Sequence, residues 1–450
     1  MFTRLRVQNF RCIGPEGIDL ELKPLTILVG ENGAGKSTLL QALALIAQTE
    51  LHAQQGAGGL RLDGPWVALQ PPDLACHRRV PATPISLGVE IEVPESELPE
   101  PFWAADHSPG PFDLDEMDPP TYRRLFAKGR HRLGYRFAYS LSGHESFKEF
   151  ALEDIVIAKM LRDRALLPHC LDAKLRAPHS SVVSARAFDG LTLVAGPEKI
   201  RPWLEMVRSL GRCMADRLAR SVRFLCAERG VAVARTSQAN ADLRLGPGRH
   251  GEHTIELLAH TFGPDGEPKA QERIGLWTER FGMARARAGW SAQVGTTFTF
   301  NDPLLEVKLS HGTAGYGSTQ ILAVITLLFA SPPGSTLLVE EPEISLHPNA
   351  QLEVVRMLAD AVGQGQQVIL TTHSSVILMG LRRVMAGPES ALRAADVAVY
   401  EVRRETSGGA VANRLRLTED AAPGGLGAVV RPEAEDELWR DWYAAAGPTE

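Results

Sequence analysis

The strongest chemical signal in the sequence is a glycine-rich segment, Gly30-Glu31-Asn32-Gly33-Ala34-Gly35-Lys36-Ser37. It matches the pattern G-x-x-x-x-G-K-[ST], in which small residues let successive backbone N–H groups curl around phosphate oxygens. In this pattern Lys36 reaches the β- and γ-phosphates of a nucleotide, and the Ser37 hydroxyl coordinates Mg²⁺. A chance glycine-rich turn is the alternative. We expect ATP and Mg²⁺ as cofactors, with the nucleotide bound by Gly30, Asn32, Gly33, Gly35, Lys36, Ser37 and Thr38.

A second group of chemically active residues, Glu340-Glu341-Pro342-Glu343, follows the apolar run Leu337–Val339. A buried strand that ends in carboxylates suits the element that completes a phosphate-binding loop, with Glu340 holding Mg²⁺ through water. Glu341 would then polarise the water that attacks the γ-phosphate. The alternative is a strand that ends in a solvated acidic turn, and the presence of the glycine-rich segment favours the catalytic role.

These residues need strands and helices to position them, and the hydrophobic pattern predicts both. Leu25–Val29 is a continuous apolar run, typical of a strand buried on both faces of a sheet, and Lys36–Gln48 has helical spacing. Near the other end of the chain, helices and strands alternate over 321–330, 336–339, 350–362, 367–371 and 374–385. This alternation predicts one α/β domain whose halves are separated by a large globular insertion.

The middle of the chain is less regular. Ile85–Val93 and Arg132–Leu141 are expected to be strands, and Pro94–Pro120 is rich in proline and acid, as an exposed connector would be. Glu198–Leu225 is expected to be one long helix, and no heptad pattern persists, which disfavours a coiled-coil arm.

Composition places further bounds on the protein. The chain has 450 residues and a net charge of −6, which excludes a histone-like polycation but allows a local basic groove. Five scattered cysteines argue for a reducing compartment, and the arginines near the start interrupt any secretory signal. No apolar run is long enough to cross a bilayer. We therefore expect a cytoplasmic protein without a membrane partner.

Four segments together resemble an ABC-type ATPase head of the branch that contains RecF, SMC, OLD-like proteins and the stand-alone ATPases of bacterial anti-phage defence. They are Asn9-Phe10-Arg11, Glu340–Glu343, Ile344–Pro348 and Thr371–Ser374. The resemblance covers about residues 1–50 and 300–400, and it implies a P-loop NTPase fold, a mixed sheet flanked by helices. We expect parts of the head at 1–50 and 301–450, head strands with a connector and a basic segment at 51–157, and an inserted, mainly helical domain at 158–300.

The resemblance also implies roles for individual residues. His373 would be the switch histidine that contacts the γ-phosphate, and Ser345–Pro348 the D-loop at a dimer interface. The signature motif departs most from the family: counting back from Glu340 aligns Gly317-Ser318-Thr319-Gln320 with Ser-Gly-Gly-Gln. Gly315, Gly317 and Ser318 would supply N–H donors to the partner's nucleotide, although Ser310-His311-Gly312 is a second candidate and helix capping by Ser318 an alternative. Glu340 stands where most relatives have Asp, and the Q-loop glutamine has no clear position.

The function that follows is a nucleotide-dependent switch: ATP joins two copies, and Glu341, His373 and Lys36 carry the hydrolysis. The segment after Gly380 lacks the D-x-D of a TOPRIM nuclease, so we expect a separate effector protein, controlled in anti-phage defence. Two alternatives stay open: a RecF-like DNA-repair ATPase and a scaffold that binds ATP without hydrolysis. DNA contact would involve a basic, aromatic segment that contains Arg123, Arg124, Lys128, Arg130, Arg132 and Arg136.

Overall fold

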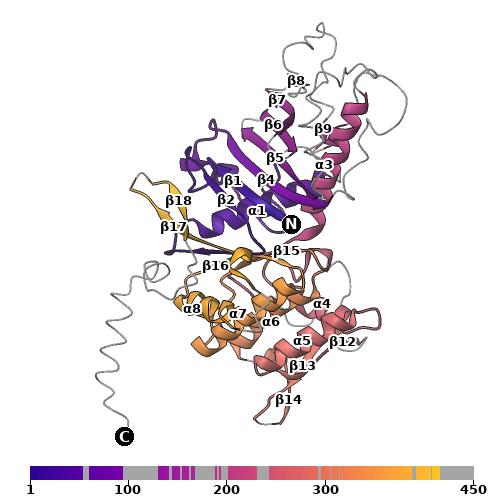
Figure 1. Ribbon diagram of the computed structural model, residues 1–450. Helices are drawn as coiled ribbons and strands as arrows, with labels where there is room; N and C mark the ends of the chain where they lie inside the picture. Colours follow the sequence, from indigo (N-terminus) through magenta and orange to yellow (C-terminus); the bar gives the residue numbers. More distant parts are fainter. Residues whose placement is uncertain are drawn as a thin grey trace.

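The computed structural model describes residues 1–53, 60–94, 130–140, 144–152, 155–161, 164–167, 188–189, 192–193, 201–230, 243–291, 295–304, 306–313, 315–387, 392–406 and 408–415. Two sheets form its centre. The antiparallel sheet has the order β2-β1-β4-β5-β6-β7-β8, and the second sheet has the order β11-β15-β16-β3-β17-β18 (Figure 1). All pairs of the second sheet are parallel except β17 with β18. We call it the parallel sheet.

The strands of the antiparallel sheet are β1 (Phe2–Gln8), β2 (Ile18–Glu21), β4 (Ile85–Pro94), β5 (Arg130–Ser140), β6 (His144–Leu152), β7 (Ile155–Leu161) and β8 (Arg164–Leu167). Those of the parallel sheet are β3 (Leu25–Val29), β11 (Val222–Leu225), β15 (Thr336–Glu340), β16 (Gln367–Thr372), β17 (Val397–Arg404) and β18 (Ala410–Leu415). Smaller sheets contain β9 (Phe188–Asp189) with β10 (Thr192–Leu193), and β12 (Ala284–Ser291), β13 (Gly295–Asn301) and β14 (Lys308–Ser310). The helices are α1 (Lys36–Ala53), α3 (Arg201–Ser221), α4 (Thr254–Thr261), α5 (Pro268–Arg280), α6 (Tyr316–Ala330), α7 (Pro348–Gly363) and α8 (Ser375–Met385).

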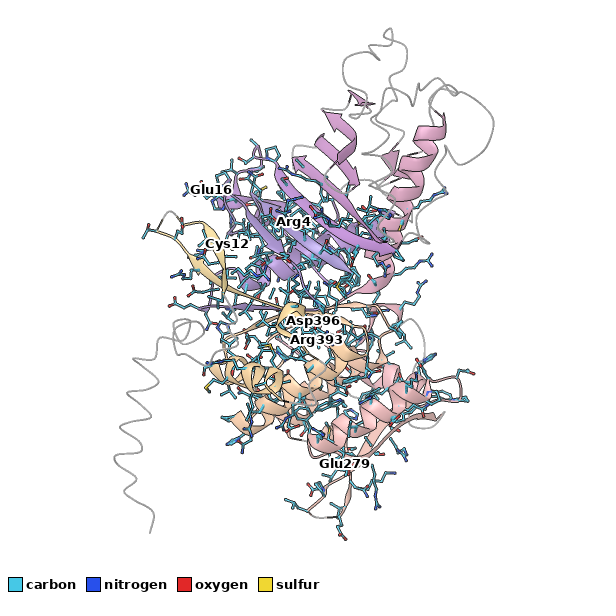
Figure 2. The ribbon with its side chains drawn as sticks, viewed as in Figure 1. Arg4, Cys12, Glu16, Glu279, Arg393 and Asp396 are labelled. Atoms are coloured by element: carbon cyan, nitrogen blue, oxygen red, sulfur yellow. The ribbon has the colours of Figure 1, made fainter. Side chains whose placement is uncertain are left out.

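Two hydrophobic cores lie on opposite faces of the parallel sheet. One joins that sheet to α1, α3 and the antiparallel sheet, and the other joins it to α4–α8 and to β12 and β13. Figure 2 shows side chains filling both layers, with Arg4 on the antiparallel sheet and Glu279 far away among the helices of the second core. A helix apolar on all sides suits this arrangement, and α6 is buried from Gln320 to Phe329.

The segment 158–300 differs from the expected helical insertion. The long helix ends at Ser221, and Val222–Leu225 forms β11, which pairs with β15 inside the parallel sheet. All four residues of β11 are buried. A short apolar run next to a helix is compatible with the last turn of that helix or with a buried strand. Here the run forms a strand because it pairs with β15 at the edge of the parallel sheet.

One glutamine ties the two large sheets together. The side chain of Gln367, at the start of β16, accepts a hydrogen bond from the Phe2 N–H at 2.9 Å and donates to the Phe2 carbonyl at 2.6 Å. It also accepts from the Thr336 hydroxyl at 3.1 Å and donates to the Lys23 carbonyl at 3.2 Å. Gln367 is buried, so these groups would otherwise lack water as well as protein partners.

We expect Gln367→Met to lower the free energy of unfolding by about 2–4 kcal/mol, because it leaves several buried polar groups without partners. Urea unfolding followed by circular dichroism measures the loss. Gln364→Met is the matched control, since Gln364 is exposed at the end of α7. Equal losses in the two variants would contradict a tie between the sheets through Gln367.

Candidate functional site

The glycine-rich loop connects β3 to α1 and forms one wall of a cavity of about 510 Å³. β3 is buried along its whole length and ends beside Gly30, where an added Cβ would collide with the carbonyl of Val402 on β17. The loop then curls back so that Lys36 Nζ donates to the carbonyls of Gly30 and Glu31, at 2.8 and 2.9 Å. The loop residues that line the cavity are Asn32, Gly33, Gly35, Lys36, Ser37 and Thr38.

The opposite wall carries Glu341 and His373, which follow neighbouring parallel strands. His373 Nε2 lies 3.1 Å from Glu341 Oε1, and His373 Nδ1 lies 3.4 Å from Lys36 Nζ. These contacts fit a neutral imidazole that accepts from Lys36 at Nδ1 and donates to the carboxylate from Nε2. The three residues expected to carry catalysis therefore come together in one hydrogen-bonded row.

The backbone of Glu341 is held in an uncommon conformation. Its φ is +43°, in the left-handed region, which costs about 1–2 kcal/mol for a residue with a side chain. Its N–H donates to the Thr371 carbonyl at 2.9 Å, and its carbonyl accepts from the Arg229 guanidinium at 2.6 Å. These bonds offset the strain and keep the carboxylate at the cavity wall.

Glu340 lies behind this wall and is 7% exposed. Its Oε2 accepts from the Ala227 N–H at 3.2 Å, whereas its Oε1 is buried with no hydrogen-bond partner among the described residues. A buried carboxylate oxygen without a partner is costly, and a water held by Mg²⁺ would supply the missing donor. Glu340 would then act on the ion through water, and the Ser37 hydroxyl, on the loop that lines the cavity, would be its direct ligand.

The charge of Lys36 is balanced against its burial. Burial lowers the pKa of the Lys36 amine, and the nearby carboxylates of Glu341, Glu343 and Glu340 oppose that change. A buried cation beside a cavity with exposed loop N–H groups is suited to receive an anion such as a triphosphate.

Glu343 has no role in the expectations from the sequence, but in the structure it supports the histidine. Its Oε1 accepts hydrogen bonds from the Thr372 hydroxyl and, at 3.4 Å, from the His373 N–H. Its Oε2 is buried without a partner among the residues described. Burial raises the pKa of this carboxyl, and the nearby Glu341 raises it further, while the hydrogen bonds oppose that shift.

Four arginines at the rim of the cavity were also missed: Arg11, Arg78, Arg79 and Arg404. The segment around Cys76 is brought there by backbone hydrogen bonds from Arg11 N–H to Ala75 and from His77 N–H to Asn9, at 2.9 and 3.1 Å. Arg11 belongs to the Asn9-Phe10-Arg11 string, which was the available signal. The chain from 71 to 80 carries no pattern that predicts this contact.

The residues expected to form the signature motif lie away from the cavity. Gly315 is the N-cap of α6, and Gly317 and Ser318 are in its first turn, so Ser318 does not cap the helix. None of the three lines the cavity. A Cβ at Gly317 would lie 2.8 Å from the carbonyl oxygen of Ser345, which shows that the expected D-loop packs on the start of α6. In the alternative string, His311 is buried, whereas Gly315 is exposed.

The basic segment keeps only part of its expected character. Arg123, Arg124 and Lys128 lie outside the described residues. On β5, Tyr135 and Phe137 are buried in the first core with ring centroids 5.3 Å apart. Two aromatic rings of this segment are thus core residues and are not free to contact nucleic acid.

Comparison with known proteins agrees with these motifs. A family model described as "AAA domain, putative AbiEii toxin, Type IV TA system" matches residues 234–379, and one described as "AAA domain" matches residues 4–62. An OLD nuclease of Thermus scotoductus is 59% identical over 46 residues, which are 10% of this chain and 8% of that protein. The chain thus matches less than a tenth of that relative.

Solved SMC heads are similar at low sequence identity. The SMC head domain from Thermotoga maritima has a TM-score of 0.41 at 9% identity, over 92% of this chain and 99% of that one. An SMC head with an extended coiled coil, bound to the C-terminal domain of ScpA derived from Pyrococcus furiosus, has a TM-score of 0.46 at 10% identity, over 97% and 99%.

The motifs and the family models, which match residues 4–62 and 234–379, support an ABC-type P-loop ATPase of the branch that includes RecF, SMC and OLD proteins. No helix among the described residues is long and apolar enough to span a membrane.

We expect Glu343→Gln to raise the temperature of unfolding near neutral pH. Burial raises the carboxyl's pKa in the folded chain above the unfolded value, so its ionisation lowers stability as pH rises. Gln keeps an acceptor for Thr372 and His373. The gain should vanish as pH falls well below the ordinary value of 4.5, because the carboxyl is then protonated in both states.

Differential scanning fluorimetry over a pH series measures this dependence. Glu279→Gln removes the same charge from an exposed site on α5 and serves as the control. A gain that is independent of pH, or shared with the control, would contradict the assignment to the buried carboxyl.

Proposed function

We propose that this chain binds ATP with Mg²⁺ in the 510 Å³ cavity and hydrolyses it, and that the bound ATP joins two copies. The observation that carries the proposal is the meeting of Lys36 and the loop N–H groups with the Glu341–His373 pair across one cavity. A phosphate-binding loop alone would support binding. The carboxylate opposite it supports attack by water as well.

The roles of the residues follow from their positions. The loop N–H groups and Lys36 hold the β- and γ-phosphates, and the rim arginines add positive charge. Mg²⁺, held by Ser37 and through water by Glu340, supplies charge neutralisation at the phosphates when bound. Glu341 accepts a hydrogen bond from the attacking water and orients it. When ATP binds, the Nε2–H of His373 turns from Glu341 to the γ-phosphate, so that the histidine distinguishes ATP from ADP.

The dimer follows from the separation of the signature from the cavity in a single chain. The first N–H groups of α6 have no acceptors within the helix, Gly315 is exposed, and Tyr316 is 66% exposed. Such a helix N-terminus suits an anion presented from outside the chain. Gly315, Gly317 and Ser318 of one copy thus complete the site of the other, in a homodimer or a higher homo-oligomer.

The switch acts on a separate effector protein in anti-phage defence, in the cytoplasm. The support is the family description that names a putative AbiEii toxin and the short OLD nuclease match. All of the described cysteines are free thiols, which agrees with a reducing compartment. The RecF-like reading keeps less support, because Tyr135 and Phe137 are core residues.

We expect Glu341→Gln to lower steady-state ATP hydrolysis by about 100-fold or more, because the general base is lost. Binding of mant-ATP should be retained, since Lys36 and the loop are unchanged. Glu279→Gln is again the charge control and should hydrolyse ATP at the wild-type rate. Equal hydrolysis by wild type and Glu341→Gln would contradict the catalytic assignment and favour a scaffold.

The same assay with and without duplex DNA separates the two biological roles. Hydrolysis that is indifferent to DNA is expected for a switch controlled by a partner protein. Strong stimulation by DNA, falling steeply with salt, would instead support the DNA-repair function.

A further inference from the structure

Arg229, in the loop after β11, is a buried arginine whose hydrogen bonds are unusual. It is 3% exposed. Its guanidinium donates to the backbone carbonyls of Cys226, Glu340 and Glu341, at 3.3, 2.8 and 2.6 Å. The side chain thus holds the end of β15 at Glu340 and Glu341, the two residues whose carboxylates belong to the site.

The same guanidinium also reaches the signature helix. Arg229 Nε donates to Gln320 Oε1 at 3.3 Å, and Gln320 Nε2 donates back to the Arg229 carbonyl at 2.5 Å. Gln320 is 2% exposed and lies in the second turn of α6. A reciprocal pair of bonds therefore connects α6 to the loop that grips Glu340 and Glu341.

Geometry explains why arginine is needed here. A guanidinium is planar and presents donors in several fixed directions, so that one side chain can bond Gln320 on one side and two successive carbonyls on another. Burial lowers the Arg229 pKa to about 10, so it remains a cation at neutral pH. A lysine would keep the charge but lose the fixed fork.

We propose that Arg229 is a positioning residue that couples the signature helix α6 to the backbone of Glu340 and Glu341 in the same chain. The inference rests on the proposed function, in which α6 touches the nucleotide held by the partner copy. A shift of α6 on the partner's nucleotide moves Gln320, and Arg229 transmits that shift to Glu341. Each site is thereby sensitive to whether the other site is filled.

The coupling has a thermodynamic consequence. Because linkage is reciprocal, a nucleotide in either site favours binding in the other. Wild-type binding and hydrolysis should therefore show a Hill coefficient above 1, and the upper limit is about 2 because the dimer has one site in each copy. The left-handed conformation of Glu341 gives the coupling a sensitive target, because its carboxylate direction depends on the bond to Arg229.

Arg229→Lys is the test variant, and Arg223→Lys is the matched control. Arg223 is also a buried arginine of this sheet, and its pKa is likewise lowered to about 10 by burial. It bonds the carbonyls of Arg220 and Ser221 and the Ser335 hydroxyl, at the opposite ends of β11 and β15 from the site. Gln320→Leu removes the other half of the connection and guards against a folding defect specific to Arg229.

Three readouts are needed: the temperature of unfolding, mant-ATP binding isotherms in the Glu341→Gln background, and steady-state ATP hydrolysis. We expect Arg229→Lys and Gln320→Leu to lower the Hill coefficient of binding and of hydrolysis, leaving only the cooperativity that dimer formation itself produces, and to slow hydrolysis by about 10-fold or more. The affinity of the first nucleotide should stay within about twofold of the unsubstituted protein, because α6 does not line the cavity of its own chain. The double variant should be no worse than either single variant, since both act through one connection.

A folded Arg229→Lys protein with an unchanged Hill coefficient would overturn the inference, even if its stability fell as much as that of Arg223→Lys. Loss of cooperativity in Arg223→Lys would also overturn it, since any buried arginine would then suffice. Failure of the proposed function appears differently: the wild-type protein itself would neither hydrolyse ATP nor bind it cooperatively.

Discussion

The site depends on the parallel pairing of β16 with β3 on one side and β15 on the other. Parallel strands end at the same edge of a sheet, so the loop after β3, the carboxylates after β15 and the histidine after β16 are brought to one place. The pairing of Thr372 with Val29 and of Glu340 with Thr371 fixes their relative heights. If the pairing of β15 slipped by one residue, each of its side chains, Glu340 included, would point to the other face of the sheet.

This edge concentrates charge that the interior must tolerate. Lys36, Glu340 and Glu343 are all buried, and oxygens of both glutamates lack partners among the described residues. The chain satisfies part of this demand internally through Ala227, Thr372 and Arg229. In the proposed function, the nucleotide and its metal ion would satisfy the remaining oxygens, and occupancy of the cavity would then stabilise this edge.

The sequence predicted the parts of the site that are local. The glycine-rich loop and the acidic string are contiguous, and the alternation of apolar strands and amphipathic helices after them indicated the parallel sheet. Long-range contacts were not predictable in this way. Arg78 and Arg79 reach the rim through backbone pairing of residues 9–11 with 75–77, and no periodicity encodes that contact. Arg229 donates hydrogen bonds to backbone carbonyls, which every residue has, so the residue types in the sequence do not identify its partners. The strand β11 could not be predicted separately from the preceding helix, because its four mostly apolar residues fit the end of a helix as well as a buried strand.

In the proposed dimer, the nucleotide bound by one copy is also contacted by Gly315, Gly317 and Ser318 of the other copy, so that ATP holds the two chains together. Sedimentation velocity of the Glu341→Gln protein, with Mg²⁺ and either ATP or ADP, measures this association, because the substitution prevents turnover during the run. We expect a dimer with ATP and a monomer with ADP. We also expect a monomer with ATP when Ser318→Arg is added, although that variant still binds mant-ATP. Identical sedimentation in ATP and ADP, or an ATP dimer that tolerates Ser318→Arg, would contradict this role of the nucleotide.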